Sequence, residues 1–121
     1  NTENETHLRY TYNCEAEFSV VLFEGTTVSA NGTAKTAYNR NRNSVSTAGT
    51  AVYTGPTVTS DGTQLREARV GSGGGSGGSG ESIGEWILAT NQKYLLRFTK
   101  AAAGTSYVST KLWWYEHTPP A

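Results

Sequence analysis

Residues 85–117, EWILATNQKYLLRFTKAAAGTSYVSTKLWWYEH, are the stretch that decides the fold class. The pattern predicts one strand at 83–88 and then a long hairpin of strands 93–100 and 106–117. The stretch also holds three of the seven tyrosines and all three tryptophans, Trp86, Trp113 and Trp114. Because the rest of the chain is polar and rich in small residues, we expect this stretch to supply the core.

The totals of the chain predict a single domain with no nucleic-acid or membrane partner. Its 121 residues suit one domain. Lys+Arg and Asp+Glu are both 10, and a neutral chain lacks the basic excess that nucleic-acid binding usually requires. No apolar run approaches the ~18–20 residues of a membrane span. Cys14 is the single cysteine, so we expect a small buried side chain and no disulfide within the chain.

Charge is distributed unevenly along the sequence. Residues 1–24 carry one basic residue, Arg9, against five glutamates, Glu3, Glu5, Glu15, Glu17 and Glu24. Residues 25–70 carry two acidic residues, Asp61 and Glu67, against Lys35, Arg40, Arg42, Arg66 and Arg69. Opposed patches of this kind allow a neutral chain to associate with copies of itself. An ordinary mixed surface is the alternative interpretation.

The periodicity of the sequence predicts an all-β protein. No window shows sustained helical spacing, and the abundance of Thr, Ser, Val, Tyr and Trp suits strands. Before residue 71, strands are predicted at 7–14, 16–24, 33–38, 48–54 and 64–70, with 57–59 extended. The second of these becomes apolar on both faces toward Phe23 and is expected to be central. With the C-terminal strands, seven to eight strands predict an antiparallel β-sandwich that is jelly-roll-like.

Residues 71–80 contain only Gly and Ser and hold seven of the fourteen glycines. We interpret them as a flexible loop or linker. The regular pattern favours an engineered linker, and a natural glycine-rich loop is the alternative.

The residue types that carry catalysis are sparse, and we expect no enzyme. His7, His117 and Asp61 would have to form any Ser-His-Asp arrangement, and no nucleophile elbow is present. We expect the two histidines on the surface, near the two ends of the domain. Glu15 and Glu17 with Glu24 or Glu116 are the carboxylates that a glycosidase would use, and we interpret them as solvated.

No cofactor or metal site is predicted. One Cys, two histidines far apart in sequence and one Asp do not supply the clustered ligands that a metal site needs.

Two features are candidates for subunit or ligand contact. Trp113 and Trp114 are adjacent and must point to opposite faces of their strand. One is expected in the core, and the other in a second layer, on a sugar-binding platform or in an oligomer contact. The second candidate is a polar loop that alternates amides with guanidinium groups and suits a polar subunit contact: Asn39, Arg40, Asn41, Arg42 and Asn43.

An ordered set of short motifs resembles small β-rich virion proteins of tailed bacteriophages. The motifs cover most of the chain: CEAEF at 14–18, FEG at 23–25, YNRNRNS at 38–44, VG at 70–71, EWIL at 85–88, YLLR at 94–97 and WYEH at 114–117. The resemblance implies a structural protein of the head or capsid surface that forms homo-oligomers and has no enzymatic residues. It implies a location on the virion after synthesis in the cytoplasm of the bacterial host.

The sequence departs from this family in two places. Family members have a further N-terminal segment, and they carry charged residues in the loop after residue 71. If a strand is missing, a sheet edge is open for a partner chain. We therefore expect a capsid decoration protein, with a trimer as the first interpretation by analogy. The alternatives are a carbohydrate-binding module that uses an exposed Trp or Tyr, and an engineered scaffold derived from such a protein.

Overall fold

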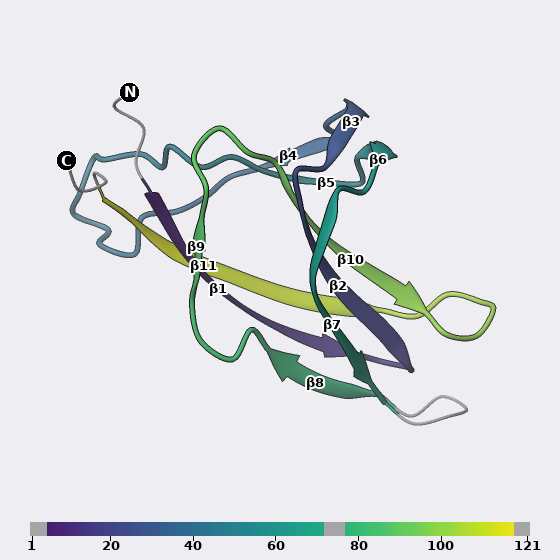
Figure 1. Cartoon of the computed structure of the whole chain (residues 1–121). Helices are drawn as coiled ribbons and strands as arrows, with labels where there is room; N and C mark the ends of the chain where they lie inside the picture. The colour runs from purple at the N-terminus through teal and green to yellow at the C-terminus, as the bar shows by residue number, and fades with distance from the viewer. Residues whose placement is uncertain (1–4, 72–76, 118–121) are drawn as a thin grey trace.

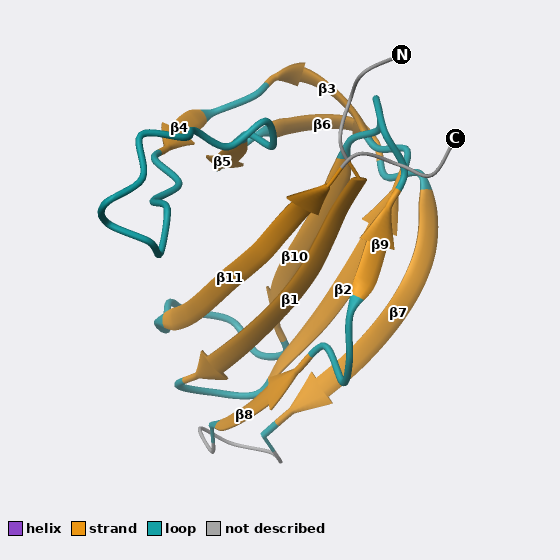
Figure 2. Ribbon diagram, turned by 90° about the vertical axis from the view of Figure 1, so that its left-hand side faces the viewer, coloured by secondary structure: helices purple, strands orange, loops and turns teal. Residues whose placement is uncertain are grey.

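Two antiparallel sheets face one another and enclose the core between them (Figure 2). A computed structural model describes residues 5–71 and 77–117, and this part of the chain contains strands and no helix. The predicted all-β antiparallel sandwich is thereby confirmed.

Each sheet is built around one N-terminal strand (Figure 1). In the first sheet, β1 (Glu5–Cys14) lies between β11 (Val108–His117) and the pair β8 (Gly78–Glu81) and β9 (Trp86–Leu88). In the second, β2 (Phe18–Glu24) lies between β10 (Tyr94–Lys100) and β7 (Thr63–Val70). The expectation that the second predicted strand is central is confirmed.

The core comes mainly from β1 and β2, because their alternating apolar residues face one another across the two sheets. The buried members of this cluster are Leu8, Tyr10, Tyr12, Cys14, Ala16, Phe18, Val20, Leu22 and Val70. Cys14 is buried as expected. The C-terminal stretch covers this core with side chains that are only partly buried, among them Trp86, Phe98 and Trp114. The prediction that residues 85–117 supply the core is therefore wrong in emphasis.

The predicted hairpin of 93–100 and 106–117 is also wrong. β10 pairs with β2 and β11 pairs with β1, so the two strands belong to different sheets. The chain crosses between the sheets beside the β1–β2 crossover, where the Glu15 amide donates to the Tyr107 carbonyl and the Ala101 amide donates to the Glu17 carbonyl. Both β1 and β2 have two edges to pair. β11 pairs with one edge of β1, and β10 pairs with one edge of β2.

A two-stranded ribbon, residues 27–60, leaves the second sheet, and we call it the arm. It consists of β3 (Thr27–Ala30) paired with β6 (Thr57–Ser60), and β4 (Thr33–Lys35) paired with β5 (Val52–Thr54). The arm crosses the end of the sandwich where β1 begins and β11 ends (Figures 1 and 2). β4 and β5 are shorter than the strands predicted at 33–38 and 48–54, and β3 was not predicted.

Two facing pairs of glycines set the bends of the arm. Gly25 and Gly62 lie at its root with φ of 75° and 88°, and Gly32 and Gly55 lie further out with φ of 91° and 68°. A Cβ on Gly62 would lie 2.2 Å from the Glu24 carbonyl oxygen, and one on Gly32 would lie 2.3 Å from that of Thr54. Glycine is required at these two positions because both the backbone conformation and the close strand approach exclude a side chain.

The glycine-rich stretch 71–80 is not a loop throughout. Its last residues belong to β8, which pairs with β1, while residues 72–76 lie outside the described part of the chain. A Cβ on Gly77 would lie 2.1 Å from the Cys14 carbonyl oxygen, and one on Gly80 would lie 2.6 Å from the Tyr12 hydroxyl. This close packing favours a glycine-rich strand over a free linker for residues 77–80.

Matched truncations of two valines test the location of the core. Val20 is 3% exposed in β2 and Val45 is 97% exposed in the arm. We expect Val20→Ala to lower the free energy of unfolding by about 2 kcal/mol, because two buried methyl groups are lost. Val45→Ala should change it by less than about 0.5 kcal/mol. Urea unfolding measures both, and equal effects would contradict the assignment of the core.

Candidate functional site

The outer face of the first sheet carries an exposed aromatic strip. Trp113 and Tyr115 of β11 are 37% and 54% exposed there, and Ile87 of β9, on the other side of β1, is 58% exposed. Trp114 points the other way and packs against the core. The prediction that the two tryptophans occupy opposite faces, with one in the core, is confirmed.

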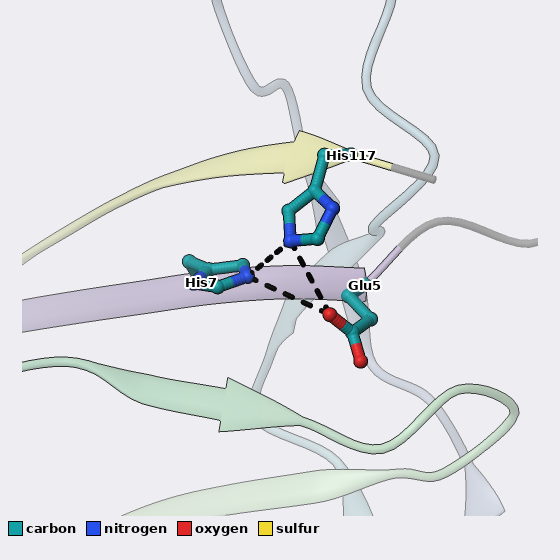
Figure 3. A group of neighbouring side chains, drawn as sticks. All are labelled: Glu5, His7 and His117. Atoms are coloured by element: carbon teal, nitrogen blue, oxygen red, sulfur yellow. Dashed lines mark hydrogen bonds and ion pairs between the residues drawn. The ribbon is translucent and has the colours of Figure 1, made fainter. Parts of the chain in front are cut away.

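A cluster of Glu5, His7 and His117 lies at the end of this strip (Figure 3). The antiparallel register of β1 and β11 places Glu5 opposite His117 and His7 opposite Tyr115. The Nε2 atoms of the two histidines are 2.6 Å apart. Oε1 of Glu5 lies 3.2 Å from Nε2 of His117 and 3.7 Å from Nε2 of His7. We call these three residues the histidine cluster.

Neighbouring side chains hold His7 in one orientation. Its Nδ1 lies 2.6 Å from Oε1 of Glu85, and its ring stacks on Tyr115 with centroids 4.5 Å apart. The Tyr115 hydroxyl donates to the same Glu85 oxygen. The hydrogen bond from His7 is the main reason that the pKa of Glu85 lies below its ordinary value. A carboxylate oxygen accepts, so Nδ1 of His7 carries a proton that it donates to Glu85. In the neutral imidazole the lone pair then lies on Nε2.

The expectation of two surface histidines near opposite ends of the domain is wrong. His7 is buried, with 8% of its area exposed, and it contacts His117 directly. The two residues are far apart in sequence, but the strands that carry them are neighbours. A sequence signal did exist, because His7 opens the first predicted strand and His117 closes the last. Only the antiparallel pairing of those strands, which periodicity cannot show, brings them together.

Glu116, next to the cluster, attaches the arm to the sandwich. Its Oε1 accepts from the Gly49 amide at 2.9 Å, and its Oε2 accepts from the Thr50 amide and from the Trp114 indole. Burial raises the pKa of Glu116, but these hydrogen bonds outweigh burial and hold the pKa below its ordinary value. Thr6 and Thr50 add a hydroxyl–hydroxyl contact at 2.6 Å.

The polar loop predicted as a contact lies at the outer end of the arm. Two of its amides are used inside the loop, since Asn39 and Asn41 accept from the backbone amides two residues on. Arg42 lies over the ring of Tyr38. Arg40, Arg42 and Asn43 remain exposed. Arg40, Arg42 and Asn43 are therefore available for contact, whereas Asn39 and Asn41 stabilise the loop.

The basic and acidic residues of the chain are divided between the arm and the sandwich. It carries Lys35, Arg40 and Arg42 and no Asp or Glu, so its formal charge is +3 and that of the rest of the chain is −3. No residue of the arm is buried. Its exposed large side chains are Tyr38, Val45 and Tyr53. These features belong to a surface that is suited to contact with an acidic partner.

The structure does not bring Glu15 and Glu17 together with Glu24. Glu15 and Glu17 precede β2 and Glu24 ends it, about 20 Å away along seven residues. Both carboxylate oxygens of Asp61 accept from Arg97 at the root of the arm, which lowers the pKa of Asp61. Glu24 accepts from the Tyr94 hydroxyl. Asp61 and Glu24 therefore each have a local structural partner.

Comparison of the chain with protein-family models, curated proteins and solved structures finds no match. Within residues 5–71 and 77–117 there is no helix with the length and apolar character that a membrane crossing requires. The assignment of a function therefore rests on the sequence and geometry of the chain itself.

Replacement of Glu116 tests the attachment of the arm. Glu116→Gln should lower the free energy of unfolding by about 1 kcal/mol at pH 7, because an amide cannot accept all three hydrogen bonds. Because the folded pKa lies below 4.5, the contribution is present above that pH and is lost as pH falls through the folded value. The variant and the wild type should therefore converge at low pH.

Glu67→Gln, on the exposed side of β7, is the matched control and should behave as wild type at both pH values. Amide hydrogen exchange at Gly49 and Thr50 reports the attachment directly. Unchanged exchange in Glu116→Gln would contradict it.

Proposed function

We propose that this chain is a structural protein of the capsid surface of a tailed bacteriophage, acting through contacts with copies of itself and with capsid proteins. The observation that carries the proposal is the arm, a ribbon of 27–60 without a buried residue. The motif resemblance supplies the virion setting, analogy with capsid decoration supplies the trimer, and the strand pattern supplies the jelly-roll-like classification. All three remain part of the proposal. The role requires no cofactor and no catalytic group.

The size and exposure of the arm favour a protein partner. A two-stranded ribbon is marginally stable by itself in water. Here two glycine pairs bend it, and Glu116 attaches it to the sandwich at Gly49 and Thr50. Its exposed aromatic and aliphatic side chains then face outward. Such an arrangement is typical of an element that becomes buried in an assembly.

The charge of the arm favours another copy of this chain as the first partner. The arm is formally +3 and the remainder −3, and the sandwich exposes Glu15, Glu67 and Glu81. A basic arm laid on the acidic sandwich of a neighbour would repeat head to tail, and it forms a ring where the rotation between copies closes. Many such weak contacts on a capsid add by multivalency.

Charge reversal on the arm tests this proposal. The native mass of the chain should show an oligomer that weakens as salt rises, because exposed charges are screened. Arg40→Glu with Arg42→Glu should raise the dissociation constant at least tenfold. Arg69→Glu with Lys111→Glu makes the same change of net charge on exposed sites of β7 and β11 and is the matched control.

A strict monomer at all concentrations, or equal weakening by both double variants, would contradict the role of the arm. Antibodies against the chain should also label capsids of the phage that encodes it in electron micrographs. Absence of labelling would remove the virion from the proposal while leaving self-association intact.

Sugar binding is the second candidate, and the aromatic strip favours it. Beside Trp113, the outer face of the first sheet has an open depression lined by polar groups of β1, β8 and β11, including Asn13, Glu81 and Lys111. An exposed aromatic face next to amide, carboxylate and ammonium groups suits the apolar face and hydroxyls of a sugar ring.

A glycan array tests this second candidate. If sugar binds here, Trp113→Ala should abolish the signal, because stacking on the indole is lost. Tyr53→Ala is the control, since Tyr53 is 43% exposed in β5 of the arm and does not line the depression. A signal that survives Trp113→Ala, or no signal with any glycan, would rule out this face.

A further inference from the structure

Three ligating atoms converge where β1, the central strand of the first sheet, pairs with β11 (Figure 3). They are Nε2 of His7, Nε2 of His117 and Oε1 of Glu5, and they lie 2.6, 3.2 and 3.7 Å from one another. Two imidazoles and a carboxylate are a donor set that Zn²⁺ binds in proteins, with a water completing the tetrahedron. The side chain of His7 is 9% exposed and that of His117 is 40% exposed, so the cluster opens to solvent on one side.

The distances fit a metal ion after a small adjustment. Zn–N and Zn–O bonds of about 2.0–2.2 Å place tetrahedral ligand atoms about 3.3 Å apart. Both distances to Glu5 are within about 0.4 Å of this value. The two Nε2 atoms are hydrogen-bonded at 2.6 Å, which is about 0.7 Å too close, so they must move apart to bind the ion. His117 ends β11 and is exposed enough to make this movement.

The surroundings of His7 are those of a metal ligand. Glu85 accepts its Nδ1 proton at 2.6 Å, which directs the Nε2 lone pair toward the cluster. Carboxylate–histidine–metal arrangements of this kind fix the tautomer and strengthen the ligand. Tyr115 stacks on the ring and also donates to Glu85. The orientation of His7 is thus determined before any ion arrives.

We propose that Glu5, His7 and His117 bind one Zn²⁺ ion, with Glu85 as the positioning residue of His7. The ion takes the place of the single proton in the hydrogen bond between the two Nε2 atoms. That proton belongs to His117 and moves to the Nδ1 atom of the same ring. Because Glu5 and His7 lie on β1 and His117 lies on β11, the ion links two strands that are distant in sequence. The two imidazole ligands disfavour Ca²⁺ and Mg²⁺, which prefer all-oxygen sites.

Calorimetric titration of the untagged, chelator-treated full chain with ZnCl₂ tests the site. We expect saturable binding of one ion per chain and a higher melting temperature with zinc, since a ligand that binds only the folded state stabilises it. Co²⁺ at the same site should give the visible absorption of tetrahedral coordination. Binding without a fixed stoichiometry, or no binding, would leave a hydrogen-bonded histidine pair only and overturn the proposal.

Three variants separate this site from adventitious zinc. His117→Ala should weaken binding by at least tenfold, and the exposure of His117 keeps the sandwich core intact. Glu85→Gln should weaken it about 10–100-fold, as for other groups that orient a ligand. Glu81→Gln, an exposed carboxylate on β8, should bind as wild type. Wild-type affinity in His117→Ala would overturn the assignment, and circular dichroism confirms the fold of each variant.

Discussion

The continuous pairing of β1 with β11 is the constraint on which the rest of the structure depends. Ten residue pairs run from Glu5 opposite His117 to Cys14 opposite Val108. This ladder completes the first sheet, places Trp114 over the core and aligns Glu5, His7 and His117. A slip of one residue would exchange the inner and outer faces of β11 and remove all of these features together.

The end of β11 shows how one strand serves two tasks. Tyr115 and His117 point to the outer face, where they contact His7, and Glu116 between them accepts hydrogen bonds from the arm. The alternation of a strand therefore separates the histidine cluster from the attachment of the arm by a single residue. The loop at the end of the basic arm also combines two tasks. It carries exposed arginines, and its side-chain amides accept hydrogen bonds from its own backbone.

The sequence predicts the fold class well because alternation over 7–14 and 16–24 is a local property that the structure keeps. It does not predict strand partners. Strands 93–100 and 106–117 are predicted as a hairpin, whereas β10 pairs with β2 and β11 pairs with β1. For the same reason the sequence does not predict that His7 and His117 are neighbours, because their contact depends on the pairing of β1 with β11. Gly78 and Gly80 were assigned to a loop by composition, whereas the close approach of β1 decides their conformation.

The order of the strands has a consequence for how the chain reaches this structure. β1 and β2 are the most apolar strands and come first, while β10 and β11, which flank them, come last. Folding must therefore close loops that span most of the sequence, and such topologies fold slowly. Until β11 arrives, β1 has an open edge and an uncovered apolar face, both of which attract other unfinished copies. Synthesis, more than the finished sandwich, is thus the stage at which this protein is most exposed to aggregation.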